Sequence, residues 1–296
     1  MKKIIALMLA VMMITMFAGC GGDKAGSAAG GEKSSGSEIS GSIDDLQIDV
    51  CGMEIGDYWD DKVLRIWSDY TNNGDYLIEP DDDLGYSIIA TQNGEELERV
   101  ISNNCPKEEY YNMCDIYPGA SARGCFSLKL LDEESPVSIW YEFDDGEQTY
   151  EIDLSDLSGA PSDTYTLEPV TDTSWFKADG ETVEIFDITY SVKGVEVIPG
   201  TGHNGEEADV LRVTYEAVSA SDEEDYIGAP FKPFQDGLSL DIGYGDEESA
   251  IELDGAQKIQ PGETVEYTYD YQLYSMDPVA VIQHTSAGQY GAIFTL

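Results

Sequence analysis

The sequence predicts an all-β protein of two tandem sandwich domains, and three observations support this. Short motifs occur twice in the same order, apolar and polar residues alternate with the period of a strand, and long helical periods are absent. The 296 residues have room for about two domains of roughly 100–200 residues each. We therefore expect two copies of one domain, a first copy at residues 43–165 and a second copy at residues 172–296.

The repeat rests on four anchors at near-equal spacing. They are Val63–Ile66, Gln92–Gly94, Pro118–Gly119 and Pro136–Val137 in the first copy, and Val210–Val213, Gln235–Gly237, Pro261–Gly262 and Pro278–Val279 in the second. The step from the glutamine to the Pro-Gly pair is 26 residues in both copies. Between the copies, residues 158–162 (Ser-Gly-Ala-Pro-Ser) have the composition of a linker.

Strand patterns follow these anchors. Phe126, Leu128 and Leu130 share one face of a strand, and a shift of 143 residues brings three more apolar side chains onto the matching face. Those side chains are Tyr269, Tyr271 and Leu273, and a further one-sided strand carries Val137, Ile139, Tyr141 and Phe143. Asn-Gly and Asp-Gly pairs supply the positive φ angles of tight turns. Short strands with a turn every ten or so residues predict sandwiches of immunoglobulin size.

The order of turns carries a resemblance. A strand rich in Val and Leu leads into Tyr70–Asn73, the turn Gln92–Leu97 follows, and Ile116–Gly119 opens the next long strand. In this arrangement both copies resemble the uncharacterised immunoglobulin-like domains of small Gram-positive-type bacterial lipoproteins. The second copy departs from the pattern at Glu216–Ser219, which replaces the asparagine pair. The resemblance implies a fold and a location outside the cytoplasm, and it implies no chemistry.

The N-terminus has the pattern of a secretory signal. Lys2 and Lys3 precede the apolar run Ile4–Phe17, which is too short for a membrane-spanning helix, and Cys20 follows Ala-Gly directly. The stretch that ends in Cys20 resembles the lipobox of bacterial lipoproteins, although Phe17 replaces the usual leucine. The resemblance implies cleavage before Cys20 and a diacylglycerol on its sulfur, whereas ordinary secretion is the alternative. We therefore expect a signal peptide at residues 1–19 and a Gly/Ser-rich tether at residues 20–42.

The charge excludes one class of partner. Fifteen Lys and Arg against 59 Asp and Glu give a formal net charge of −44, so the clusters of basic residues that hold a phosphate backbone are absent. The same charge argues against electrostatic docking on anionic lipid. We expect the lipid anchor to hold the chain on the outer side of the membrane, where its partner is a protein or a small ligand.

Four cysteines besides Cys20 lie in the first copy. Outside the cytoplasm they predict two disulfides, for which we expect the pairs Cys105–Cys114 and Cys51–Cys125. Free thiols are one alternative, and a zinc site is another. The Cys-x2-Cys spacing of most zinc sites is absent, so we expect no metal.

Catalytic patterns are weak. His203 and His284 are the only histidines, and no Gly-x-Ser-x-Gly motif accompanies them. Acidic clusters such as Glu79–Asp83 fit solvated loops or a weak calcium site, and carboxylates are too abundant to single out a hydrolase pair. We expect no cofactor and no enzymatic activity.

Two tryptophans are candidates for a binding face. Trp67 and Trp140 alternate with core residues on two strands of the first copy, so both point away from the core. The alternative is that they pack against an edge loop or the neighbouring domain. The sequence thus predicts a cell-surface lipoprotein that is a non-catalytic binding or interaction module. A structural accessory subunit of an envelope complex, or a hydrolase with dispersed carboxylates, would be the alternatives.

Overall fold

The computed structural model describes residues 39–84, 87–101, 106–163, 165, 180–202, 205–245, 257–285 and 288–296. The all-β prediction is confirmed, because these residues form β1 to β20 and only two short helices, α2 (Pro80–Leu84) and α3 (Glu108–Tyr111). Neither helix in the described part of the chain has the length and apolar character to cross a membrane.

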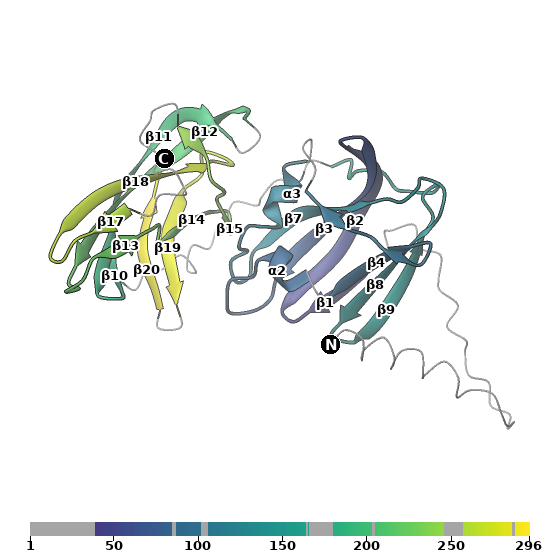
Figure 1. Cartoon of the computed structure of the whole chain (residues 1–296), viewed down its shortest axis with the longest axis horizontal. Helices are drawn as coiled ribbons and strands as arrows, with labels where there is room; N and C mark the ends of the chain where they lie inside the picture. Colours follow the sequence, from purple (N-terminus) through teal and green to yellow (C-terminus); the bar gives the residue numbers. More distant parts are fainter. Residues whose placement is uncertain are drawn as a thin grey trace, which may run out of the picture. The chain divides into compact units, whose positions relative to one another are not determined.

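The first copy is a sandwich of two antiparallel sheets (Figure 1). One sheet has the order β1 (Ser40–Ile43), β2 (Leu46–Tyr58), β3 (Asp61–Asn72), β7 (Ser121–Lys129), β6 (Arg99–Val100). The other has the order β5 (Glu95–Glu96), β4 (Ile88–Gln92), β8 (Val137–Phe143), β9 (Gly146–Ile152). Strand β1 begins at Ser40, inside the segment expected to be tether up to residue 42.

The second copy repeats this arrangement. Its first sheet has the order β10 (Thr182–Ile185), β11 (Ile188–Thr201), β12 (Glu207–Ser219), β18 (Thr264–Gln272), and β16 (Tyr244–Gly245) also pairs with β11. Its second sheet has the order β15 (Leu238–Ser239), β14 (Lys232–Gln235), β19 (Val279–Thr285), β20 (Gly288–Phe294). A short ribbon pairs β13 (Asp225–Ile227) with β17 (Gln257–Ile259).

Each copy has its own hydrophobic core between its two sheets. Leu64 and Ile66 are fully buried in the first core, as Leu211 and Val213 are in the second, so the shared Val-Leu-Arg anchors are core strands. The expected apolar faces of β7 and β8 also point into the first core. Burial of each large apolar side chain stabilises the fold by about 1.5–3 kcal/mol, which explains why the alternation persists in both copies.

The shared turns have the expected backbone. Asn93 and Gly94 have φ angles of 55° and 83°, and Asp236 and Gly237 have 50° and 85°. Two successive positive φ angles define the type I′ turn that matches the twist of a hairpin. The prediction of tight turns at these pairs is confirmed.

A bulge that the sequence reasoning missed is also shared. The β2–β3 register shifts between Val50 and Gly52, and the β11–β12 register shifts between Val192 and Gly194. A bulge leaves one extra residue unpaired, here Cys51 in the first copy and Lys193 in the second. The signal in the sequence is Val-x-Gly at a spacing of 142 residues, which is a fifth anchor of the repeat.

The described residues all belong to one compact unit, Glu32–Leu296, because the two copies contact each other. The turn between β14 and β15 meets the segment before β7, where Tyr117 donates its backbone N–H to the Gly237 carbonyl at 2.8 Å. Beside it, Ile116 forms a β-bridge with Leu238. Leu238 is fully buried and joins the first copy's core, and Tyr274 packs against the same core, so the second copy contributes side chains to its neighbour's core.

Candidate functional site

Several predicted site residues lie outside the described residues. These are the lipidation candidate Cys20 with the signal peptide and most of the tether, the disulfide candidate Cys105, and His203. The lipid anchor therefore stays a prediction.

The expected disulfides do not form among the described cysteines. Cys51, Cys114 and Cys125 are all free thiols. Cys51 lies at the bulge of β2 with its Sγ 3.8 Å from an Asp69 carboxylate oxygen, whereas Cys125 is buried on β7. Strand alternation places Cys51 and Cys125 on the side opposite the apolar face, which favours this pair, but a shared direction does not bring two sulfurs together.

The environments of these thiols disfavour thiolate chemistry. Burial, with a smaller contribution from the Asp69 carboxylate, raises the pKa of Cys51 to about 12. Burial likewise raises the pKa of Cys114 to about 12 and holds the pKa of Cys125 well above its usual range. Metal binding and nucleophilic attack both need the thiolate. Within the described residues no group of three or more His, Cys, Asp or Glu side chains converges as a metal site would require.

The expectation that Trp67 contributes to an exposed binding face is wrong. Trp67 lies on β3 and is only 4% exposed. Its pairing partner on β2 is Gly52, and a side chain added there would collide with Pro161 and the Gly159 carbonyl. The segment that follows the first copy's last strand therefore lies close over this part of the sheet. This arrangement corresponds to the alternative that Trp67 packs against an edge loop.

Trp140 belongs to the other sheet, so the two tryptophans cannot form one face. It lies half-buried on the outer side of β8, and its pairing partner on β4 is Ile89, which is 41% exposed. We define the open face as the outward residues of β4, β8 and β9, namely Ile89, Thr91, Ser138, Trp140, Glu142, Glu147, Thr149 and Glu151. All of these residues are at least partly exposed to solvent.

The equivalent surface of the second copy is covered. Phe234, Ala280 and Ile282 lie on the outer side of β14 and β19 and are at most 1% exposed. They form a small cluster with Tyr117 of the first copy, whose ring centroid lies 5.6 Å from that of Phe234 and 5.9 Å from that of His284. We call this surface the covered face.

Charged groups border this contact. Lys232 of the covered face forms an ion pair with Asp115, which precedes Tyr117 by two residues. The nearby Glu79 has its pKa raised to about 7, chiefly by burial and also by the carboxylates of Asp82 and Asp115. The Tyr117 contact thus combines a buried aromatic side chain with an acidic rim that meets a lysine.

Tyr117 is the residue that sequence reasoning missed. Its Pro-Gly neighbours were recognised as a turn, and nothing in the local pattern marks the tyrosine as an inter-copy contact. Its counterpart before the second Pro-Gly pair is Gln260, so the difference between the copies was the available signal.

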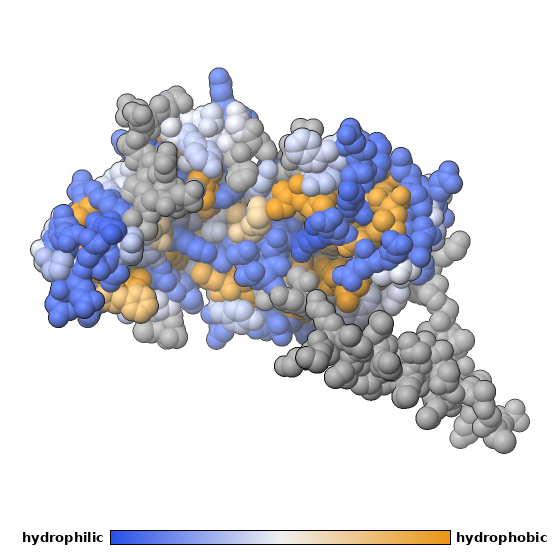
Figure 2. Space-filling model, viewed as in Figure 1, coloured by the Kyte–Doolittle hydropathy of each residue, from blue (hydrophilic) through white to orange (hydrophobic). Residues whose placement is uncertain are grey.

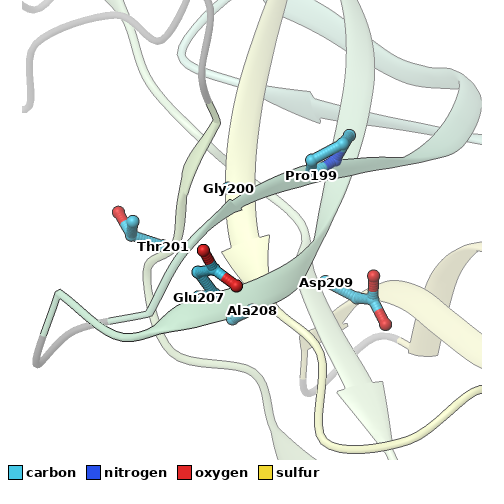
Figure 3. Close-up of a pocket in the computed structure, with 6 residues that line it drawn as sticks. All are labelled: Pro199, Gly200, Thr201, Glu207, Ala208 and Asp209. Carbon is cyan, nitrogen blue, oxygen red and sulfur yellow. The ribbon is translucent and has the colours of Figure 1, made fainter.

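The described residues also line two hollows. One of about 630 Å³ lies at the end of the β11–β12 hairpin and is lined by Pro199, Gly200, Thr201, Glu207, Ala208 and Asp209. Figure 3 shows that the Glu207 and Asp209 carboxylates lie apart, so they form no pair of acid and base. A smaller hollow of about 210 Å³ opens between β4 and β7. Ile89 of the open face lines it together with Leu97, Phe126, Glu96 and Arg99, so its wall is both apolar and charged. Neither brings together groups with catalytic roles.

The strongest ion pairs are structural. Arg212 and Asp270 form a buried bidentate pair with both N–O distances at 2.8 Å. In the first copy Arg123 donates its Nε–H to Asp69 at 2.6 Å and also pairs with Asp163. Such pairs satisfy buried charge and leave no group free to act on a substrate.

Comparison with known proteins gives one match. No curated protein and no solved structure matches the chain. A family described as "Domain of unknown function (DUF5067)" matches twice, at residues 27–142 and 168–284. Each match overlaps one sandwich and ends before its last strand, β9 or β20, and the two together cover most of the sequence. The chain therefore belongs to the DUF5067 family and carries two tandem copies of its domain.

Proposed function

We propose that this chain is a lipid-anchored, non-catalytic interaction module that acts outside the cytoplasm through two immunoglobulin-like domains. The Phe17–Cys20 motif after an apolar run supports the anchor. Two packed antiparallel sheets in each copy support the immunoglobulin-like comparison.

One observation carries the interaction role. The family's domain already makes a protein–protein contact within this chain, where Tyr117 of one copy is 1% exposed on the outer face of the other. Apolar side chains pack on its ring, Gln289 donates a hydrogen bond to its hydroxyl group, and the Lys232–Asp115 ion pair lies beside it. A buried aromatic anchor with a polar and charged rim is the composition of a binding interface.

Anchoring is tested by substitution of Cys20. Cys20→Ser removes the sulfur that would carry the diacylglycerol, so we expect release into the medium or retention of the uncleaved signal peptide. Radiolabelled palmitate should label the wild-type chain and not the variant. Cys51→Ser serves as the matched control and should leave both labelling and membrane fractionation unchanged. Labelling that survives in Cys20→Ser would exclude the anchor.

Binding is tested by photo-cross-linking on intact cells that carry the full chain. A photoreactive residue replaces Thr149, which is exposed on β9 beside Trp140, or Tyr226, which is 58% exposed on β13. We expect a discrete adduct from position 149 and none from position 226. No adduct at position 149, or the same adducts at both positions, would contradict the interaction role.

A further inference from the structure

We propose that the open face of the first copy is the docking site for a turn of another protein that carries an aromatic residue at its tip and lysine or arginine beside it. This inference rests on the proposed interaction role and names the chemistry of the partner.

The first argument is the equivalence of the two faces. Gln92 ends β4, which pairs with β8, and Gln235 ends β14, which pairs with β19. Strand β4 therefore corresponds to β14, and β8 corresponds to β19. Ile89 pairs with Trp140 in the first copy, and Lys232 pairs with Ile282 at the same register in the second. The open face therefore occupies the position of the covered face.

The second argument is the difference in burial. On the covered face Phe234 and Ile282 are each 1% exposed, because Tyr117 and its neighbours pack on them. On the open face Ile89 is 41% exposed and Trp140 is half-buried. Figure 2 shows that hydrophilic residues prevail on the visible surface and that apolar residues lie in separate patches. The open face thus leaves a neighbouring Trp–Ile pair accessible at the position where the covered face buries its apolar side chains.

The third argument is charge. On the covered face a lysine meets the acidic flank of the Tyr117 turn through the Lys232–Asp115 ion pair. Strands β4, β5, β8 and β9 contain no Lys or Arg, whereas Glu96, Glu142, Glu147 and Glu151 surround the Trp–Ile pair. The open face is therefore acidic where the covered face carries a lysine, so a turn that complements the open face has basic residues beside its aromatic side chain.

A second copy of this chain does not fit these requirements. Its own aromatic turn residue Tyr117 is already buried, and Gln260 replaces it in the other copy. A formal net charge of −44 also makes two chains repel each other. The occupant is therefore a different protein with a basic turn.

The probe is a synthetic peptide, Lys-Lys-Ile-Tyr-Pro-Gly-Ala-Ser, which repeats residues 114–121 around Tyr117 with lysine in place of both Cys114 and Asp115. The compact unit Glu32–Leu296 is labelled with ¹⁵N-tryptophan, and the indole signal of Trp140 is assigned by its loss in Trp140→Ser. We expect millimolar peptide to shift this signal and to leave the signal of buried Trp67 unchanged. The shift should require at least about tenfold more peptide when serine replaces the peptide's tyrosine.

Controls separate the elements of the proposal. Trp59→Ser removes an exposed tryptophan elsewhere in the first copy and should bind the peptide like the wild type. A peptide with two glutamates in place of the lysines should bind at least about tenfold more weakly at low salt. No shift of Trp140, an equal response to the serine peptide, or an equal response to the glutamate peptide would overturn the proposal. Self-association that Trp140→Ser abolishes would overturn it in favour of a second copy.

Failure of this proposal is distinguishable from failure of the proposed function. If the peptide does not bind but position 149 still cross-links on cells, the chain has a partner of different chemistry. If position 149 gives no adduct, the interaction role itself is contradicted.

Discussion

At the residue scale, Trp59 combines two features that stability alone does not favour. It lies at the tip of the β2–β3 hairpin with a φ angle of 52° and is 74% exposed. The left-handed conformation costs an L-residue roughly 1–2 kcal/mol, and glycine adopts it freely. A large apolar side chain there buries little surface in return.

Trp59→Gly should therefore stabilise the chain. Relief of the left-handed strain exceeds the added entropy of glycine in the unfolded state, and we expect the free energy of unfolding to rise by about 0.5–1 kcal/mol. Urea denaturation followed by circular dichroism measures it. Ile293→Gly is the control, because this exposed residue lies within strand β20 and its replacement should destabilise. Equal effects of the two substitutions would contradict the strain argument.

At the scale of elements, the buried glutamines show what the repeat preserves. Gln92 donates to the carbonyls of Asp132 and Ser135 and accepts the N–H groups of Leu131 and Asp132. Gln235 forms the corresponding four bonds to the loop before β19. The glutamine thus connects a hairpin of each sandwich to the loop that leads into the neighbouring strand.

Loss of this connection should be costly. Gln92→Ala leaves two partly buried carbonyls and two N–H groups without their partner, so we expect a loss of about 2–3 kcal/mol in the free energy of unfolding. Gln235→Ala should cost the same in the second copy. Gln283→Ala, which removes one bond to the His284 carbonyl, should cost less than about 1.5 kcal/mol. Thermal or urea unfolding gives the comparison, and a loss at Gln92 no larger than at Gln283 would show that the loops hold without it.

The sequence predicted elements better than sites for a physical reason. Alternation, Asn-Gly turns and the Val-Leu-Arg anchors are local patterns, and the core faces of β3, β7 and β8 followed from them. The burial of Trp67 depends on a segment almost a hundred residues later in the chain, and the Tyr117 contact depends on the second copy. Contacts between residues far apart in sequence leave no periodic pattern to read.

At the scale of the whole molecule, the contact between the copies should depend on pH. Glu79 lies beside Asp82, Asp115 and Lys232, and its pKa rises from an ordinary value of 4.5 to about 7. A carboxyl with a raised pKa in the folded state contributes most stability when it is protonated. That contribution is lost as the pH rises from about 4.5 to about 7, and it stays lost above that range.

Glu79→Gln should remove this dependence, since glutamine is neutral at every pH. We expect the melting temperature of the variant to match the wild type near pH 4.5 and to exceed it at pH 8. Scanning calorimetry across this range measures the difference. Glu223→Gln, in an exposed loop of the second copy, should show no such trend. A difference between Glu79→Gln and wild type that is constant with pH would contradict the raised pKa.

The same contact should protect the second copy from local opening. Tyr117→Ala removes the ring that covers Phe234 and Ile282, and truncation of a buried aromatic side chain costs about 3–5 kcal/mol. We expect backbone amides of residues 231–240 to exchange with deuterium at least about tenfold faster, as followed by mass spectrometry. Trp140→Ala alters the open face, which lies on the other copy and takes no part in the Tyr117 contact, and should leave exchange in residues 231–240 unchanged. If Tyr117→Ala leaves their exchange at the wild-type rate, the tyrosine does not hold the copies together.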